Sequence, residues 1–218
     1  IPTRRALDRL LRDYERPLLV HLRHKFRVSE DQARDWLQGF VEKKILGQRL
    51  LSLAKEEKGR FRAFVRKALE NYIGDEFDRQ NSRKRNPTGG LERLDEATHA
   101  VTAAGPASPV CSADYEWAWT VIERAKERTR AFYDAQGTPR TWAVFCEGPL
   151  TDRQERPSNA ELARRHGFAS AKQVEGALIT AQRQFGKQLR AVVAETVKDA
   201  ADIEAEIRYL IAILSDAG

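Results

Sequence analysis

Apolar residues recur at helical spacing along most of this chain, and the pattern is clearest between residues 59 and 85. Seven of them fall three or four positions apart there, which places them on one side of a helix: Phe61, Phe64, Val65, Ala68, Leu69, Tyr72 and Ile73. Most intervening positions are basic or polar, and we expect these to face outward: Arg62, Arg66, Lys67, Asn71, Arg79, Arg83, Lys84 and Arg85. The pattern predicts a helix with one face on a core and the other on nucleic acid. A solvated amphipathic helix is the alternative.

A helical period also runs through the preceding part of the chain, first in LDRLLRDYERPLLVHLRHKF and again after Ser29. Pro17 marks either a kink or a helix start there. The Ser29 hydroxyl can accept a hydrogen bond from an unpaired backbone N–H at a helix start. The two acidic residues that follow, Glu30 and Asp31, would interact favourably with the positive end of the helix dipole. We therefore predict a helix over residues 29–46, ended by Gly47, with the next helix opening at Gly59.

The second half of the chain opens with a different composition. Residues 86–112 lose the helical period and are rich in Pro, Gly, Ala, Ser and Thr, which is typical of an interdomain linker. Farther on, two helical patterns flank HGFAS, where Gly167 suits a left-handed turn and Ser158 and Ser170 can cap the helices. This pattern predicts a helix-turn-helix, a motif that also occurs in proteins that never touch DNA. Its inner surface should hold Ala160, Leu162, Ala163, Phe168, Val174, Ala177, Leu178, Ala181 and Phe185.

The charge is distributed unevenly. The formal net charge of +6 indicates a polyanionic partner. Residues 1–90 hold 22 Lys and Arg against 13 Asp and Glu, a net charge of +9, and residues 158–198 again carry a net charge of +4. Two basic modules are therefore separated by a stretch with little net charge. An acidic tail follows them.

The acidic tail, residues 199–218, carries a net charge of −4. Its apolar residues fall at helical spacing opposite an acidic face, which predicts a short amphipathic helix: Ile203, Ile207, Leu210, Ile211 and Leu214. We hypothesise that this helix docks on the helix-turn-helix or on a partner, where its negative charge competes with DNA. Simple capping of the second domain's core is the alternative.

Together these patterns predict an all-α protein of two helical domains joined by a flexible linker. The first domain covers residues 1–85 and the linker residues 86–112. The second domain, residues 113–198, contains the helix-turn-helix, and residues 199–218 form the amphipathic C-terminal extension.

Other kinds of chemistry are not indicated. The motifs GxxxxGK, GxSxG and HExxH do not occur, so we predict no catalytic activity and no cofactor. His21 and His24 lie three residues apart, but no partner stands at ligand spacing, so we predict no metal site. Cys111 and Cys146 are expected to be inert thiols. No apolar run could span a bilayer, and we expect a cytoplasmic protein without a signal peptide or membrane insertion.

The order of these modules resembles the extracytoplasmic-function (ECF) RNA polymerase sigma factors. The likeness rests on ARDWLQGF in one helix, RAFVRKALENYIGDEFDRQNSRKR in the next, a linker and a terminal helix-turn-helix, and so covers nearly the whole chain. GRFRAFV and the acidic extension are most similar to a planctomycete-type branch. The resemblance implies a factor that directs RNA polymerase core to specific promoters and begins DNA melting, nucleoid-associated when engaged. The implied partners are the clamp coiled coil of core polymerase and promoter DNA, with an anti-sigma factor as a further candidate.

The resemblance also implies roles for particular residues of the first domain. In the family a helix with the pattern A-x-D-x-x-Q docks on the polymerase clamp, and Ala33, Asp35 and Gln38 occupy those positions. Four neighbours would supply apolar contacts: Trp36, Leu37, Phe40 and Val41. The following helix and a loop at about residues 53–58 would open and read the −10 element. Its implied DNA contacts are Arg60, Arg62, Arg66, Lys67, Asn71, Arg79, Arg83, Lys84 and Arg85.

In the second domain, the helix that begins near Ala171 would enter the major groove of the −35 element. The residues implied to contact DNA there are Ser170, Lys172, Gln173, Glu175, Arg183, Lys187 and Arg190. The turn from Gly167 to Val174 is two residues longer than is usual in the family, and the helix is less basic. We therefore expect a weak contact with the −35 element.

Two other functions stay open from the sequence. One is a helix-turn-helix regulator that binds duplex DNA without polymerase, and the core-docking helix separates this from a sigma factor. The other is a helical protein-interaction adaptor whose basic modules meet acidic protein surfaces. A steep fall of DNA affinity with salt would argue against the adaptor, because only phosphate contacts release counterions.

Overall fold

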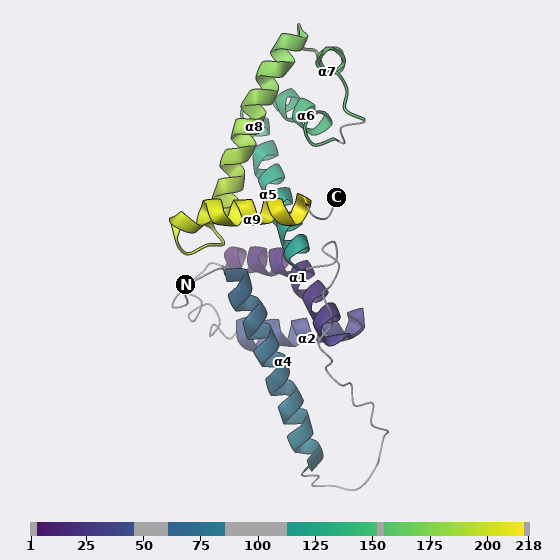
Figure 1. Cartoon of the computed structure of the whole chain (residues 1–218), viewed down its shortest axis with the longest axis vertical. Coiled ribbons are helices and arrows are strands. Elements are labelled where there is room, and N and C mark those ends of the chain that lie inside the picture. Colours follow the sequence, from purple (N-terminus) through teal and green to yellow (C-terminus); the bar gives the residue numbers. More distant parts are fainter. Residues whose placement is uncertain (1–3, 46–60, 86–112, 152–154, 216–218) are drawn as a thin grey trace. The chain divides into compact units, whose positions relative to one another are not determined.

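The structure, a computed structural model, describes residues 4–45, 61–85, 113–151 and 155–215, with the backbone alone for residues 4–11 and 80–85. These parts of the chain form helices joined by turns, and no strand occurs among them (Figure 1). The predicted all-α class is confirmed for the described residues. The loop predicted at residues 53–58, both helix-boundary glycines (Gly47 and Gly59) and the predicted linker lie outside them.

The chain divides into two compact units. The first unit comprises Ile1–Ala118, Thr196–Asp202 and Arg208–Gly218, and the second comprises Trp119–Glu195 and Ile203–Ile207. The helices α5 (Ala113–Ala135) and α9 (Ile203–Ser215) therefore contribute residues to both units. The predicted domain boundaries stay predictions, because the segment between residues 85 and 113 is not among the described residues.

The first unit takes three long helices from the first half of the chain. They are α1 (Arg4–Phe26), α2 (Glu30–Phe40) and α4 (Phe61–Arg85), and one π-helical turn, η1 (Val41–Ile45), continues α2. The Ser29 hydroxyl accepts a hydrogen bond from the backbone N–H of Gln32 at 3.2 Å, which confirms the predicted N-cap. As far as Ile45, the last residue described there, the helix predicted over residues 29–46 is an α-helix that widens after Phe40 into a π turn.

Pro17 lies inside α1, so a helix start at this residue is wrong. A proline removes one backbone N–H, but the hydrogen bonds on either side keep the helix continuous. The helix ends instead at Phe26. Arg27 has a positive φ of 53°, and the chain leaves the helix through this left-handed residue before Ser29 begins the next helix.

The core of the first unit forms from the inner faces of α1, α2 and α4. Its fully buried side chains include Leu22, Ala33, Phe40, Ile45, Val65 and Leu69. The predicted apolar stripe of α4 is confirmed: Val65, Leu69, Tyr72 and Ile73 are buried, and Phe61, Phe64 and Ala68 are half-buried. Burial of one such aliphatic side chain stabilises the fold by roughly 1.5–3 kcal/mol, so this stripe fixes α4 firmly on the core.

Gly39 determines how closely α2 approaches α4. A Cβ atom added at this position would lie 2.5 Å from the hydroxyl oxygen of Tyr72, which is shorter than real Cβ contacts. The close approach of the two helices thus depends on the missing side chain.

The second unit packs α6 (Pro139–Glu147), α7 (Asn159–His166) and α8 (Ala171–Ala194) with the part of α5 that begins at Trp119 (Figure 1). Their buried side chains form one core: Tyr133, Val144, Phe145, Leu162, Ala163, Val174, Leu178 and Ala181. Of the inner positions expected for this segment, only Ala160 is wrong. It is exposed because it lies in the first turn of α7, and the others are buried or half-buried.

The predicted C-terminal helix is present as α9, after a short 3₁₀ turn, η3 (Ala200–Asp202). Two details of its predicted faces are wrong. Ile211 is 56% exposed, because it stands one residue past the buried Leu210 and so lies at the edge of the apolar stripe. Glu206, expected on the outer acidic face, is buried, because it lies between Ile203 and Leu210 on the inner side.

Candidate functional site

The residues implied to bind polymerase separate into an exposed pair and a set that packs inside. Asp35 and Gln38 are exposed on the outer side of α2. The remaining five face inward or are half-buried: Ala33, Leu37 and Phe40 are buried, and Trp36 and Val41 are half-buried. Burial on one side and polar residues on the other follow directly from the period of the helix.

Trp36 is positioned by two other aromatic rings. Its ring centroid lies 5.7 Å from that of Phe26 and 5.4 Å from that of Phe77, both in edge-to-face orientation. Such pairs stabilise packing beyond the area that they bury. Trp36 therefore joins α1, α2 and α4, and it is not free to act as a projecting anchor.

A pocket of about 330 Å³ opens beside Gln38. Its lining is mostly apolar and includes Tyr14, Leu18, Leu19, Leu37 and Val41, with Glu15 and Arg34 at charged positions. The Gln38 side chain donates a hydrogen bond to Glu42 at 3.0 Å. Among the described residues, the structure places no ion-pair partner beside Asp35. This part of α2 thus offers an exposed carboxylate at Asp35 and, at Gln38, an amide that lines an apolar pocket.

The cations predicted on α4 are less uniformly exposed than the sequence indicated. Arg62 was expected to face outward, and this is wrong. Its side chain is only 11% exposed, and its Nε atom lies 3.2 Å from Oδ1 of Asp114 in α5, within the first unit. Arg66 is half-buried, with Nη1 3.7 Å from Oδ2 of the same carboxylate. The carboxylate stands at the start of another helix, so no local pattern in α4 reveals it.

The remaining predicted residues of α4 have different surroundings. Lys67 and Asn71 are exposed one turn apart. Arg79 is exposed and pairs with Glu76 at 2.6 Å. Arg83, Lys84 and Arg85 belong to the helix, but their side chains lie outside the described parts, as does Arg60 altogether. Within the described part of α4, Lys67 and Asn71 are therefore a cation and an amide of the predicted set that are exposed together.

Two lysines of η1 pair with the acidic stretch of α4. Lys43 Nζ lies 2.8 Å from Glu76 Oε1, and Lys44 Nζ lies 3.7 Å from Asp75 Oδ2. The hydrogen bond from Lys43 holds the pKa of the Glu76 carboxyl below its usual range. These pairs reduce the net negative charge on the α4 surface after Asn71.

A polar cluster that the sequence did not reveal joins α1 to α4. His21 Nε2 and Lys25 Nζ each lie 2.8 Å from Glu70 Oε1. Burial lowers the pKa of the His21 imidazole, although the Glu70 carboxylate opposes this change. Burial raises the pKa of Glu70, but the hydrogen bonds from Lys25 and His21 outweigh it and leave that pKa lowered. His21 is thus a partly buried partner of α4 with a structural role.

In the second unit, local caps position α7 and α8. The Ser158 hydroxyl accepts from the backbone N–H of Glu161 at 3.2 Å, and the Ser170 hydroxyl accepts from that of Gln173 at 3.3 Å. Gly167 ends α7 with a φ of 68°, a left-handed conformation that disfavours residues with a Cβ. These three predicted local features are confirmed.

The residues implied to contact the −35 element are all exposed: Ser170, Lys172, Gln173, Glu175, Arg183, Lys187 and Arg190. Besides Ser170, whose hydroxyl caps α8, two of them are engaged within the chain. The Gln173 side-chain oxygen accepts a hydrogen bond from the backbone N–H of Ala169 at 3.0 Å. Arg190 Nε lies 2.7 Å from Glu204 Oε1 in α9, within the second unit. Counting only partners among the described residues, the structure assigns no ion pair to three exposed cations of α8: Lys172, Arg183 and Lys187.

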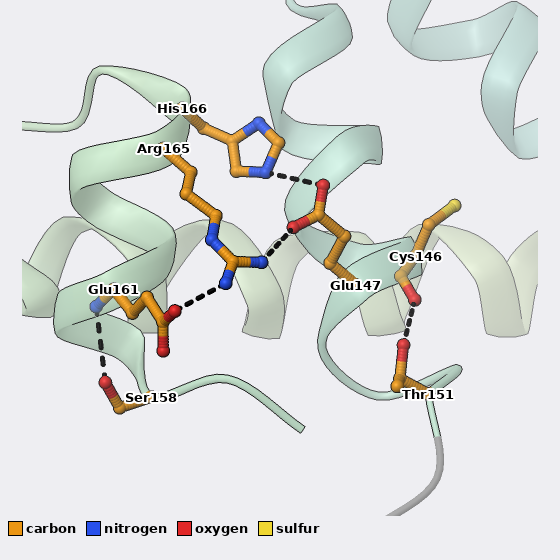
Figure 2. A network of polar contacts seen from close by, with 7 residues as sticks. All are labelled: Cys146, Glu147, Thr151, Ser158, Glu161, Arg165 and His166. Atoms are coloured by element: carbon orange, nitrogen blue, oxygen red, sulfur yellow. Dashed lines mark hydrogen bonds and ion pairs between the residues drawn. The ribbon is translucent and has the colours of Figure 1, made fainter. Parts of the chain in front are cut away.

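A polar network fixes α7 against the end of α6 (Figure 2). Arg165 Nη1 lies 3.4 Å from Glu147 Oε2, and the same guanidinium also pairs with Glu161. His166 Nε2 lies 3.0 Å from Glu147 Oε1, close enough for an ion pair when the imidazole is protonated but not aligned as a hydrogen bond. After α6, the Thr151 hydroxyl donates to the carbonyl of Cys146 at 3.0 Å.

The turn between α7 and α8 is held by Arg140 at the start of α6. Its guanidinium donates to the carbonyl of Gly167 at 3.2 Å and stacks 4.7 Å from the ring centroid of Phe168. Sequence reasoning missed both this contact and the Glu147 network, because the partners belong to different helices.

Within the described ranges, no group of three or more His, Cys, Asp and Glu side chains could hold a metal ion. No helix in the described part of the chain is long and apolar enough to cross a membrane. Burial raises the pKa of the half-buried Cys146 thiol. Comparison of the chain with family models, curated proteins and solved structures finds no match. Function is therefore inferred from the placement of its own residues.

Proposed function

We propose that the protein is a sigma factor that directs bacterial RNA polymerase core to specific promoters and begins DNA melting. The observation that carries the proposal is the surface of α2, where Asp35 and Gln38 are both exposed and Gln38 lines a mostly apolar pocket. These two residues are the polar members of the A-x-D-x-x-Q pattern that resembles the core-docking helix of ECF sigma factors. The third member, Ala33, is buried and holds the helix on its own core.

The chemistry of this surface suits a protein partner better than DNA. A carboxylate next to an amide can pair with cationic and hydrogen-bonding side chains, and the pocket can receive an apolar side chain of the partner. The buried members of α2 and the close contact at Gly39 keep this surface in a fixed orientation. A preformed surface lowers the entropic cost of docking on the polymerase clamp.

The proposed contact with the −10 element uses α4. Lys67 and Asn71 are exposed together, and a cation next to an amide suits a strand whose phosphates must be neutralised and whose bases are unstacked. The stripe that contains Phe64 and Tyr72 packs on the core, so base stacking is not its role. Arg60 and residues 83–85 belong to the same proposed contact.

The proposed contact with the −35 element uses α7 and α8 as a helix-turn-helix. The capped helices, the left-handed Gly167 and the exposed cations of α8 support this assignment. Gln173 and Arg190 already have partners within the chain, so Lys172, Arg183 and Lys187 carry most of the proposed phosphate contact. Residues 86–112 are the proposed linker between the two DNA-binding modules.

The proposal is tested by binding of the purified full chain to bacterial core RNA polymerase in a pull-down. We expect the wild type to bind and Asp35→Ala/Gln38→Ala to lose most of the binding. A matched control is Asp31→Ala/Gln32→Ala, which removes the same residue types from exposed positions in the first turn of α2. The control should bind as the wild type does.

Failure of the wild type to bind a cognate core would overturn the proposal. Equal loss in both double mutants would show general damage to α2 in place of a specific docking surface. If the chain binds duplex DNA but not core, a helix-turn-helix regulator that works without polymerase becomes the better assignment, because α7 and α8 do not depend on the α2 surface.

A further inference from the structure

Side chains from three helices of the first unit meet at the start of α4. Arg62 Nε lies 3.2 Å from Asp114 Oδ1, and the Tyr209 hydroxyl of α9 donates to Asp114 Oδ2 at 3.0 Å. The Arg62 guanidinium also lies over the Tyr209 ring, 4.6 Å from its centroid. Arg66 Nη1 stands 3.7 Å from Asp114 Oδ2. One carboxylate therefore faces two arginines and a hydroxyl group.

The carboxylate of Asp114 is the anion that faces the N–H donors of Arg62 and Arg66. Arginine binds carboxylate and phosphate through the same planar set of N–H donors, so either anion can satisfy it. The Arg62 side chain is 11% exposed, and the Tyr209 ring covers a face of its guanidinium. A DNA phosphate cannot reach Arg62 in this arrangement. Arg66, at 39% exposure, is only partly accessible.

The backbone at this point is also engaged. The N–H of Phe61, the first residue of α4, donates to the carbonyl of Thr196 at 3.2 Å. The first N–H groups of a helix have no partner within it and favour anions. At the start of α4, the Thr196 carbonyl therefore accepts from the first backbone N–H, and the Asp114 carboxylate pairs with the side chains of Arg62 and Arg66. Thr196 and Asp114 each belong to a segment that follows the proposed linker in the sequence.

We propose that Asp114 and Tyr209 form a latch, which holds Arg62 and Arg66 in the free protein and opens when the first unit binds a DNA strand. The inference rests on the proposed function, because it assumes that α4 contacts DNA. It adds a regulatory role to two residues outside the DNA-contacting set, one in α5 and one in the C-terminal helix. The C-terminal helix thus limits DNA binding until the latch is released.

The latch predicts a change in the salt dependence of binding. The probe is a fluorescein-labelled single strand of mixed sequence, about 15 nucleotides long, within the range of known single-strand binding sites. Asp114→Asn removes the charge that competes with phosphate. We expect the full-length variant to bind at least several-fold more tightly at low salt. The slope of log K against log salt should steepen by about 0.7 for each arginine released, up to about 1.4.

Asp134→Asn is the matched control. It removes the same charge from an exposed position on α5, where Asp134 pairs with Arg130 at 3.7 Å within the second unit. A general change in net charge would strengthen binding equally in both variants. Tyr209→Phe gives a second variant that keeps the ring but removes the hydrogen bond to Asp114. Its affinity should lie between those of the wild type and Asp114→Asn.

The outcomes separate the two proposals. No salt-dependent binding by the wild type and the variants would overturn the DNA-binding function itself. Salt-dependent binding with the same slope in Asp114→Asn and Asp134→Asn would overturn the latch and leave the function standing. Circular dichroism melting checks that each variant folds. If Asp114→Asn fails to fold, Tyr209→Phe decides, and wild-type affinity in that variant would overturn the latch.

Discussion

At the scale of single residues, the structure changes the role of several charged side chains. Arg62 is paired where an outward cation was expected, and His21 pairs with α4, a contact that the sequence did not indicate. Both depend on carboxylates that stand in other helices, Asp114 and Glu70. The sequence thus shows which residues of a helix are charged, but it does not show which residue of another helix each of them pairs with.

The cluster of His21, Lys25 and Glu70 predicts that the fold weakens in acid. Burial lowers the pKa of His21, so the folded state favours the neutral imidazole. The stability from this group is present above the ordinary imidazole pKa of about 6.5 and is lost as pH falls toward the lowered value. Glu70 has a lowered pKa as well, so its contribution is lost at still lower pH.

Thermal melting at pH 7.5 and pH 5.5 measures this effect, with His21→Gln beside the wild type. Glutamine can keep a hydrogen bond to Glu70 but does not titrate. We expect the melting temperature of the wild type to fall more between these pH values than that of His21→Gln. His24→Gln, at an exposed position of the same helix, should behave as the wild type. An equal fall in all three proteins would remove His21 as the cause.

At the scale of elements, the helices follow from local patterns, and their packing does not. Ser29, Ser158 and Ser170 act as caps because a hydroxyl next to a helix start needs no distant partner. The π-helical turn at residues 41–45 was not predicted, and the sequence did not decide whether Pro17 starts a helix or lies inside α1. A π turn and a proline inside a helix both deviate from an ideal helix, so periodicity alone does not report them.

The contact between α2 and α4 gives a prediction for Gly39. Gly39→Ala places a Cβ 2.5 Å from the Tyr72 hydroxyl oxygen, so we expect a loss of about 1–3 kcal/mol in the free energy of unfolding. Urea denaturation measures it. Gly74→Ala is the control, since a Cβ there meets nothing within 4 Å, and an alanine inside a helix should add about 0.5–1 kcal/mol. A neutral Gly39→Ala would show that α2 can shift without cost.

At the scale of the whole molecule, the C-terminal helix contributes to both compact units. In the first unit its Tyr209 contacts Asp114, and in the second its Glu204 contacts Arg190. The sequence suggested that the acidic tail competes with DNA for basic residues of the helix-turn-helix. The Arg190 pair identifies one contact through which this competition would act.

Glu204→Gln should then strengthen binding of the full chain to duplex DNA at low salt. Loss of the ion pair frees one cation, so the slope of log K against log salt should steepen by up to about 0.9. Fluorescence anisotropy with a labelled duplex measures both quantities. Asp202→Asn removes the same charge from an exposed residue just before α9 and serves as the control. Equal affinities of the two variants would show that the Arg190 pair does not compete with DNA.

The sequence by itself determined the all-α class, the caps at Ser29, Ser158 and Ser170, the left-handed end of α7 at Gly167, and the apolar face of α4. These depend on interactions within one or two turns, and the helical period reports them directly. Only the tertiary structure decided that Gln38 lines an apolar pocket, that Gly39 meets Tyr72, and that Arg62 is held by Asp114. The physical reason is that such contacts join residues far apart in the chain, and their energies arise only when helices pack together.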